Sequence, residues 1–318
     1  MSDKLINATN LKKSFDQFIA VDNIDLSVSR GEVVGFLGPN GAGKSTTMKM
    51  LTGFLEPDNG EISINGVNLK SHPLEAKEYI GYLPEGAPSY SDMIVSDFLS
   101  FIGKMRGLSD NSLSNRLDKM ADQINLKEMW NRPIETLSKG FKRRVGIAQA
   151  LIHDPDILIL DEPTDGLDPN QKHEMRNLIK RISTNKAIVI STHILEEVEA
   201  VCSRAVIIAD GKLLANDTPK NLENKFLNKN TLSIKVSNKI NNVVSKDIKS
   251  LIKYDDVKIQ KTDMSTHTIL VSDNKKVPNL NTVLKQINKH KLNVTEANFQ
   301  KINLEEIFRT ITSGSNSK

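Results

Sequence analysis

The segment GPNGAGKST at residues 38–46 constrains the fold most, because it matches the pattern GxxxxGK[ST]. It lies between the strand-like run EVVGFL and a helix-like run, which is the context that this pattern requires. Glycines let backbone N–H groups face phosphate oxygens, and the following helix N-terminus adds partial positive charge. The residues expected to bind a nucleoside triphosphate are Gly38, Pro39, Asn40, Gly41, Ala42, Gly43, Lys44, Ser45 and Thr46.

The same pattern assigns roles to two of these side chains, and a second segment adds two carboxylates. Lys44 should reach the β- and γ-phosphates, and Ser45 should ligate Mg²⁺. The buried run ILILDEP at residues 157–163 predicts a strand that carries Asp161 and Glu162 to its carboxyl end, the usual ligand edge of such sheets. Asp161 suits the coordination of Mg²⁺, and Glu162 suits positioning and deprotonating the attacking water. The alternative is a pair of residues that merely cap the strand.

Strand and helix patterns alternate along the rest of the first two thirds of the chain, which predicts an α/β fold with a mainly parallel sheet. The run EISINGVNL at residues 61–69 has Asn65 and Gly66 between alternating residues and predicts an antiparallel hairpin. Strand patterns are missing from about residue 91 to residue 155, where helical spacing predicts an inserted helical subdomain.

The composition changes around residues 217–232, which are polar and rich in Asn and Lys after Pro219. We therefore expect one domain over residues 1–225 and a small α+β domain over residues 230–312, whose order of patterns suggests a ferredoxin-like βαββαβ unit. The helix-like run NLEEIFRTIT ends this second domain. Residues 313–318 are expected to form a disordered tail.

Composition and charge exclude several classes of protein. A single cysteine, Cys202, excludes an intrachain disulfide and gives no sign of a metal site, so we read it as buried filler. Residues 231–318 hold 15 Lys and Arg against 8 Asp and Glu, but the lysines are dispersed. This favours a solvated surface over a patch for anionic lipid or nucleic acid. Neither a secretory signal nor an apolar run of about 20 residues is present, so we expect a protein that stays inside the cell.

Residues 137–144, LSKGFKRR, resemble the LSGGQ-type signature of the ATP-binding cassette (ABC) ATPases, about 20 residues before Glu162. The resemblance covers roughly residues 4–225. It implies an ATP- and Mg²⁺-dependent ATPase that works as a dimer, in which Ser138 and Gly140 reach the γ-phosphate held by the partner cassette. Helix N-termini bind phosphate well, so the position is also physically reasonable.

The signature departs from the family pattern at Lys139 and Phe141, where glycine and glutamine are commonest. One hypothesis is that Lys139 adds a cation near the partner's phosphate, and the alternative is a solvent-facing lysine. If Lys139→Gly left ATP affinity and turnover unchanged, the hypothesis would fail. Arg143 and Arg144 are expected to anchor the helix surface, with a role in catalysis as the alternative.

Three further positions match the family, and a fourth departs from it. His193 resembles the switch histidine that contacts the γ-phosphate, although a lone histidine after a strand is more often structural. Asp168 resembles the aspartate that links two cassettes. Phe15 resembles the aromatic that stacks on adenine, with a core phenylalanine as the alternative. Glu85 replaces a glutamine that meets Mg²⁺ and the membrane subunit, and a carboxylate can also ligate Mg²⁺.

Within the family, the runs GYLPEGAP and ILILDEPTDGLDPNQ resemble the cassettes of type-2 bacterial exporters, especially the gliding-motility-associated and sodium-exporter-like groups. The resemblance implies a second cassette, identical or not, and integral membrane permease subunits as partners, at the cytoplasmic face of the inner membrane. No nucleic acid is expected as a partner. Two alternatives remain open: a soluble ABC ATPase acting on ribosomes or nucleic acid, and a module that only senses ATP. The single phosphate-loop pattern argues against the first, and Glu162 with His193 against the second.

Overall fold

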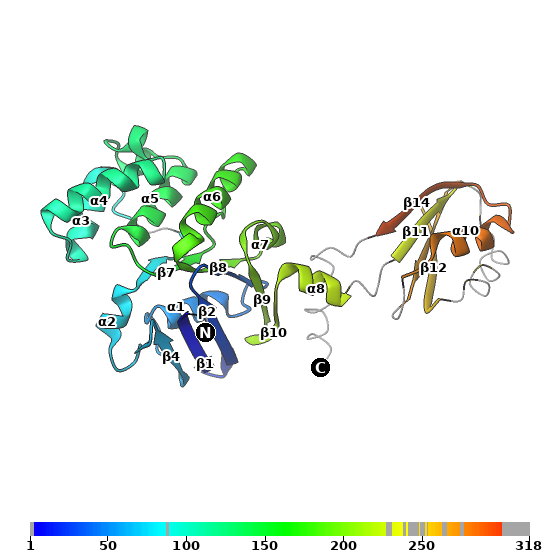
Figure 1. The fold of residues 1–318 in the computed structure, drawn as a ribbon, viewed down its shortest axis with the longest axis horizontal. Coiled ribbons are helices and arrows are strands. Elements are labelled where there is room, and N and C mark those ends of the chain that lie inside the picture. The colour runs from blue at the N-terminus through cyan, green and yellow to red at the C-terminus, as the bar shows by residue number, and fades with distance from the viewer. Residues whose placement is uncertain are drawn as a thin grey trace. The chain divides into compact units, whose positions relative to one another are not determined.

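A computed structural model gives the fold of the chain, shown in Figure 1. The residues that it describes are 3–86, 89–226, 231–237, 240, 248, 252, 254–262, 266–273 and 277–300. The chain separates into two compact units, Met1–Pro219 and Lys220–Ser317, within the segment where the composition changes. The helix α8 (Pro219–Phe226) occupies this segment, and proline is well suited to its first position because a first-turn N–H has no partner within a helix.

The central sheet of the first unit has six strands in the order β10-β9-β3-β8-β7-β6. Their bounds are β3 (Val33–Leu37), β6 (Ile80–Leu83), β7 (Ile157–Asp161), β8 (Ala187–Thr192), β9 (Arg204–Ala209) and β10 (Lys212–Asp217). Every neighbouring pair is parallel except β9 with β10, which form the hairpin at the edge. The predicted mainly parallel sheet is confirmed.

A second sheet of the first unit is antiparallel, with the order β2-β1-β4-β5. Its strands are β1 (Lys4–Phe15), β2 (Phe18–Ser29), β4 (Asn59–Ile64) and β5 (Val67–Asn68). The predicted turn at Asn65 and Gly66 joins β4 to β5, and both residues have positive φ angles, 49° and 82°. Asn and Gly tolerate that conformation best, which is why this pair makes a tight hairpin.

Helices connect the strands and form the inserted subdomain. The helices of the core are α1 (Lys44–Leu51), α2 (Pro73–Glu78), α6 (Pro169–Ile182) and α7 (Leu195–Val201), with the 3₁₀ turn η3 (Ser183–Asn185). The insertion contains α3 (Val95–Met105), α4 (Asp110–Gln123) and α5 (Lys139–Leu151), with the 3₁₀ turns η1 (Lys127–Met129) and η2 (Ile134–Thr136). The face predicted from Val145, Ala148, Leu151 and Ile152 is fully buried.

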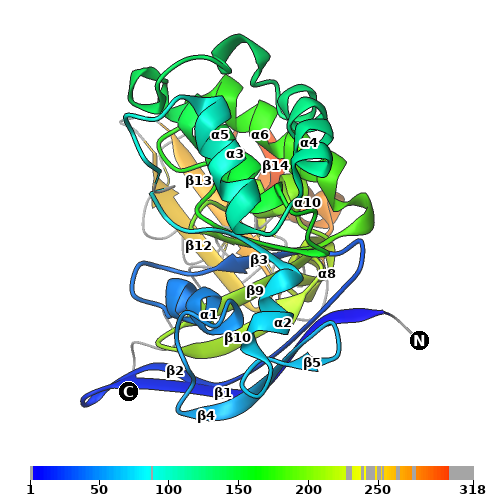
Figure 2. The same ribbon diagram turned by 90° about the vertical axis from the view of Figure 1, so that its left-hand side faces the viewer.

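The two faces of the parallel sheet contribute to different hydrophobic cores. On one face Phe36 and Ile159 pack in the same cluster as Met48 of α1 and side chains of the antiparallel sheet. Helix α1 therefore lies between the two sheets, as Figure 2 shows. On the other face Leu158 and Leu160 pack with α3, α5 and α6. Both faces of the parallel sheet are covered, which explains why β7 and β8 are apolar almost throughout.

The second unit contains a four-stranded antiparallel sheet in the order β12-β13-β11-β14. Its described elements are β11 (Thr231–Val236), β12 (Asp256–Lys261), β13 (His267–Ser272), α10 (Leu280–Asn288) and β14 (Val294–Gln300). This is the strand order that the ferredoxin-like interpretation requires. Of the helix predicted near residues 246–253, Ile248 is recorded as helical and most of the rest is not described. The helix expected at 303–312 and the tail at 313–318 lie outside the described residues.

The contact between β6 and α5 leads to a testable prediction. A Cβ on Gly81 would lie 2.1 Å from the backbone oxygen of Ala150, so Gly81→Ala must push the helix away from the sheet. We expect Gly81→Ala to lower the free energy of unfolding by about 3 kcal/mol in urea denaturation. Gly103→Ala is the control, since a Cβ there meets the flexible end of Leu113 and a helical alanine is favoured. Equal stability of the two variants would contradict the prediction.

Candidate active site

Three neighbouring parallel strands end at one edge of the central sheet and carry the site. β3 leads into the phosphate loop (residues 38–46), β7 ends at Asp161, and β8, which lies between them, ends directly before His193. Segments that are far apart in the sequence therefore meet. Ligands of open parallel sheets bind at this carboxyl edge, so the sequence prediction of the site location agrees with the topology.

The phosphate loop is held against its surroundings by two glycines that accept no side chain. A Cβ on Gly38 would lie 2.4 Å from the oxygen of Ile208, and a Cβ on Gly43 would lie 2.3 Å from the oxygen of Ala20. Gly41, in contrast, has open space around its Cα, and its φ angle is +80°. The loop is therefore packed closely at Gly38 and Gly43 and is exposed at residues 39–41, where a phosphate chain could approach.

Lys44 is a buried cation that forms no ion pair with a carboxylate in the described part of the chain. Its side chain is 7% exposed, and Nζ donates to the backbone oxygens of Gly38 at 2.7 Å and Pro39 at 3.2 Å. Burial lowers the pKa of Lys44, while the negative charges of Glu162, Asp161 and Glu85 act in the opposite direction. An ammonium group that is bound only to neutral carbonyls is well suited to accept an anion such as phosphate.

Two of the three oxygen ligands expected for Mg²⁺, Ser45 and Asp161, lie together. Ser45 Oγ is 3.4 Å from Oδ1 of Asp161, and the Ser191 hydroxyl also donates to that carboxylate. A hydroxyl beside a buried carboxylate fits Mg²⁺, which uses one or two protein oxygens in addition to phosphate oxygens and water. Glu85 lies on an exposed turn after β6, near enough for its charge to affect Lys44.

Glu162 adopts a backbone conformation that is unusual for its residue type. Its φ angle is +48°, in the left-handed region that non-glycine residues rarely adopt. Its N–H donates to Ser191 Oγ at 3.0 Å and to the Ser191 oxygen at 3.2 Å, which fixes this turn to the end of β8. Strained conformations of this kind persist where the surroundings hold them, and they are common at active sites.

The Glu162 carboxylate lies against His193. Nδ1 of His193 is 3.0 Å from Oε1 and 3.1 Å from Oε2 of Glu162. Burial raises the pKa of the Glu162 carboxyl, and its hydrogen bond with His193 and the charges of His193 and Lys44 oppose that rise. A carboxylate with a raised pKa is better suited to accept a proton from water near neutral pH. The His193 side chain remains 48% exposed and can reach a ligand.

A separate group of predicted residues lies at the starts of two helices, α5 and α6. Ser138 caps α5 by accepting from the N–H of Phe141 at 3.4 Å, and Asp168 caps α6 by accepting from the N–H of Gln171 at 2.9 Å. A Cβ on Gly140 would lie 2.9 Å from the Gln171 side chain, so the two helix starts pack closely. No contact of Ser138 or Asp168 with the phosphate loop is recorded among the described residues.

The positions that depart from the family pattern have distinct environments. Lys139 is exposed, and its Nζ lies 3.5 Å from where a Cβ of Gly166 would be, so its role near a partner's phosphate stays a prediction. Phe141 packs against the core with the Arg144 guanidinium 5.8 Å from its ring. Arg144 also bonds the Ile124 oxygen and Glu174, as expected of a surface anchor, but Arg143 is only 7% exposed and does not fit that description.

Two lesser sequence interpretations can be compared with the structure. Phe15 lies at the end of the β1–β2 hairpin with 46% of its surface exposed, which excludes the core alternative and leaves it available for stacking. Cys202 packs over Gly35, and burial raises the pKa of its thiol to about 12, so it is an inert packing residue, although it is half-buried and not fully buried as expected.

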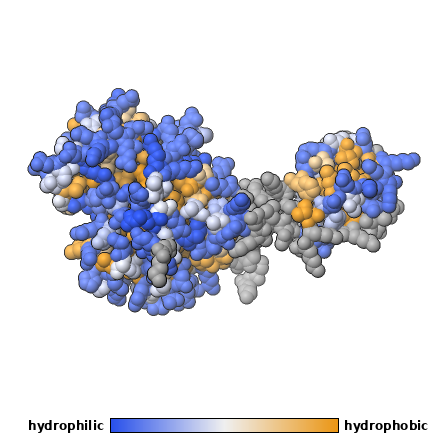
Figure 3. Space-filling model, viewed as in Figure 1, coloured by the Kyte–Doolittle hydropathy of each residue, from blue (hydrophilic) through white to orange (hydrophobic). Residues whose placement is uncertain are grey.

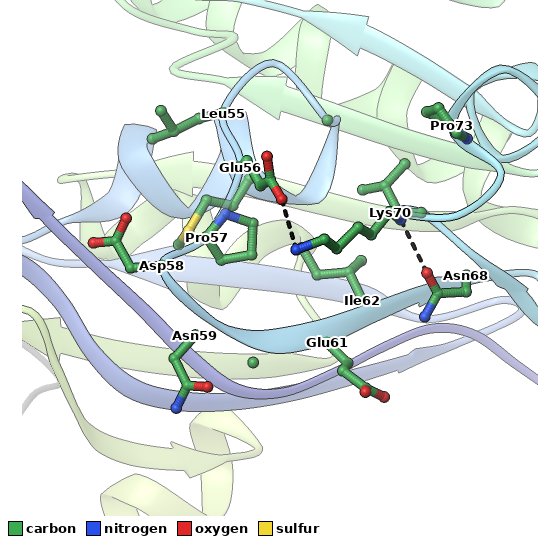
Figure 4. Close-up of a pocket in the computed structure, with 14 residues that line it drawn as sticks. Leu55, Glu56, Pro57, Asp58, Asn59, Glu61, Ile62, Asn68, Lys70 and Pro73 are labelled. Carbon is green, nitrogen blue, oxygen red and sulfur yellow. Dashed lines mark hydrogen bonds and ion pairs between the residues drawn. The ribbon is translucent and has the colours of Figure 1, made fainter.

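A cavity of about 560 Å³ lies away from this site, between the end of α1, β4 and the start of α2. Figure 4 shows that the ion pair of Glu56 with Lys70, at 2.9 Å, crosses it. None of the residues that were predicted to bind nucleotide lines this cavity. The chemistry therefore belongs to the sheet edge and not to this cavity.

Sequence reasoning missed four polar side chains of the site: Ser191, Thr192, Thr164 and Glu197. Ser191 and Thr192 end a strand next to the one that carries Asp161, which was a usable signal. Glu197 could not be distinguished in the sequence from its neighbours Glu196 and Glu199, because only the packing of α7 turns it inward.

The fold and the site define a nucleotide-hydrolysing cassette, and comparisons with known proteins place it in a family. The family model described as ABC transporter matches residues 21–165. Linearmycin resistance ATP-binding protein LnrL of Bacillus subtilis (strain 168) is 33% identical over 97% of this chain and 98% of its own length. Nod factor export ATP-binding protein I of Ralstonia nicotianae is 34% identical over 70% of this chain and 69% of its own length.

A solved structure supports the same conclusion. The structure titled "Structure of ATP binding subunit of ABC transporter" matches with a TM-score of 0.64 and 31% identity, over 70% of this chain and 93% of that chain. The chain belongs to the ABC transporter ATP-binding proteins, and it hydrolyses ATP to power transport. The comparisons give no support to the soluble alternative. No helix in the described part of the chain is long and apolar enough to span a bilayer.

The contact of His193 with Glu162 leads to a prediction for the pH dependence of ATP turnover. Glu162 must be deprotonated to act as a base, so turnover falls as the pH falls through its raised pKa. His193→Ala removes the hydrogen bond that favours the carboxylate, which raises this pKa further. We therefore expect the acid limb of the pH–rate profile to move to higher pH. His173→Ala, an exposed change on α6, should leave it in place. An unmoved acid limb in His193→Ala would contradict the proposed coupling.

Proposed function

We propose that this chain is the ATPase subunit of an ABC exporter, and that it works as a pair of cassettes coupled to integral membrane permease subunits. The observation that carries the proposal is the separation of the predicted site into two groups. Lys44, Asp161, Glu162 and His193 gather at the sheet edge, while Ser138 stands at the start of α5 without a recorded contact to them. The second group suits the nucleotide of another cassette.

The residues of the sheet edge divide the work on ATP. The phosphate loop and Lys44 bind the phosphates through backbone N–H groups and one cation. Ser45 and Asp161 would hold Mg²⁺, which neutralises charge on the phosphate oxygens when it is bound. Glu162 orients and deprotonates the attacking water, and His193 holds the Glu162 carboxylate and reaches toward the γ-phosphate. Phe15 supports the adenine ring by stacking.

An exposed apolar surface suggests where the membrane partner binds. Figure 3 shows a mainly hydrophilic face that is interrupted by separate apolar patches. Among the exposed apolar side chains, Phe54 (74% exposed) contacts Tyr82 of β6, whose ring centroid is 5.5 Å away. Leu74 of the adjacent α2 is 81% exposed. Since β6 leads to Glu85, the movement produced when the cassettes close can be transmitted through this region to a permease.

The names of the relatives support the direction of transport. LnrL is a resistance protein and the Ralstonia relative is a Nod factor export protein, and both names suit outward transport. We propose that this chain works at the cytoplasmic face of the plasma membrane, which suits the ATPase subunit of a transporter. ATP binding drives closure of the cassette pair, and hydrolysis reopens it.

The role of Glu162 can be tested with Glu162→Gln. The glutamine keeps the shape of the side chain and the phosphate loop is untouched, so we expect ATP affinity to be retained. Turnover should fall by about 10²- to 10⁴-fold because water activation is lost. ATP should then trap a closed dimer, visible by size-exclusion chromatography. Lys44→Ala is the comparison variant and should lose ATP binding. Unimpaired turnover in Glu162→Gln would refute the assignment.

Glu85 can be tested through its dependence on metal ions. The negative charge of Glu85 acts on Lys44, so Glu85→Gln changes the electrostatics of the phosphate and metal region. We expect the ratio of Mg²⁺- to Mn²⁺-supported ATP turnover to differ between Glu85→Gln and the parent. Glu75→Gln, an exposed change on α2, is the matched control. Identical metal profiles for Glu85→Gln and the parent would count against metal contact by Glu85.

A further inference from the structure

Glu197 of α7 is a buried carboxylate that has no role in the function described so far. It is 4% exposed. The Thr164 hydroxyl donates to its Oε1, and the Thr192 hydroxyl donates to its Oε2 at 2.7 Å. No ion pair of Glu197 is recorded within the described ranges. A buried carboxylate that is compensated only by two hydroxyl groups is a costly choice for stability alone, since an apolar residue would fill the site at lower cost.

The two threonines lie beside the two side chains that act on water. Thr164 follows Glu162 by two residues, and Thr192 directly precedes His193. Glu197 therefore joins the turn after β7 to the last residue of β8. Thr192 Oγ1 also accepts from the N–H of Ile194 at 3.0 Å, which leaves its hydrogen directed at Glu197.

The turn after β7 is the one that needs stabilising contacts. Glu162 has a φ angle of +48°, which its own residue type does not favour. Ser191 holds the start of this turn through the Glu162 N–H, and Glu197 holds its far side through Thr164. Because Ser191 lies in β8 and Glu197 in α7, the turn after β7 is attached at both ends, and the 3.0 Å contact of Glu162 with His193 is constrained from two directions.

Helix α7 reaches this position because β3 carries a glycine where the helix crosses it. A Cβ on Gly35 would lie 2.7 Å from Sγ of Cys202 and 3.2 Å from Cγ2 of Val198. The absence of a side chain lets α7 pack directly on the strand that leads into the phosphate loop. Glu197 is thus placed by the same strand that positions the phosphate loop.

We propose that Glu197 is a positioning residue for ATP hydrolysis, which clamps Thr164 and Thr192 so that Glu162 and His193 keep a productive mutual geometry. The inference rests on the proposed roles of Glu162 and His193. Glu197 touches neither nucleotide nor water in this role. Its loss should slow the chemical step and leave ATP binding intact, because Lys44 and the phosphate loop do not depend on its hydrogen bonds.

A pair of variants at Thr164 separates this role from a general effect on folding. Thr164→Val keeps the size of the side chain and removes the donated hydrogen bond, whereas Thr164→Ser keeps the hydroxyl. We expect kcat for ATP to fall about tenfold or more in Thr164→Val, because small misplacements of catalytic groups have large effects on rate. ATP affinity, measured with a fluorescent nucleotide, should stay at the parent value. Thr164→Ser should retain most of the parent kcat.

Glu197→Gln should behave like Thr164→Val, and Glu196→Gln is its control. Glu196 lies on the same helix but is exposed, and its Oε2 lies 3.9 Å from Nη2 of Arg176. The proposal is overturned if Thr164→Val keeps the parent kcat, if Thr164→Ser loses as much as Thr164→Val, or if ATP affinity falls together with kcat. Should Glu197→Gln fail to fold, the Thr164 pair decides by itself. A parent without ATP turnover, or a fully active Glu162→Gln, would refute the proposed function instead.

Discussion

The parallel pairing of β3, β8 and β7 is the constraint on which the rest of the structure depends. Parallel strands end at the same edge, so the phosphate loop, His193 and Glu162 arrive together although more than 100 residues separate Lys44 from Glu162 in the sequence. Cores on both faces hold these strands: α1 and the antiparallel sheet on one side, and the helical insertion with α6 on the other. The precision of the site follows from the rigidity of this sandwich.

Burial shifts the pKa values of two charged groups at this edge in opposite directions. It lowers the pKa of the Lys44 ammonium and raises the pKa of the Glu162 carboxyl, so in each case it disfavours the ionised form. Each group partly offsets the cost for the other. This arrangement suits a site that must attract an anion and also remove a proton from water, since both tasks need charged groups that are incompletely solvated.

The second group of predicted residues is the one for which we propose contact with another cassette. Ser138 and Asp168 each cap a helix, and the contact of Gly140 with Gln171 packs these two helix starts together. The two helix starts therefore form one packed unit. The two departures within the signature lie at the start of α5: Lys139 is near Gly166, and Phe141 packs against the core. Phe141 thus adds a core contact where the commonest family residue is polar.

The sequence was enough to predict the order of elements, the phosphate loop and the two carboxylates at the end of β7, and it indicated a change of domain around residues 217–232. These predictions follow from local rules: the spacing of glycines, alternation of apolar residues, and the turn at Asn65 and Gly66. The folded packing decided which of Glu196, Glu197 and Glu199 turns inward, because α7 packs closely on Gly35. It also decided that Arg143 is buried and that Ser191 bridges two strands. Such contacts join residues that are distant in the sequence, and no local pattern encodes them.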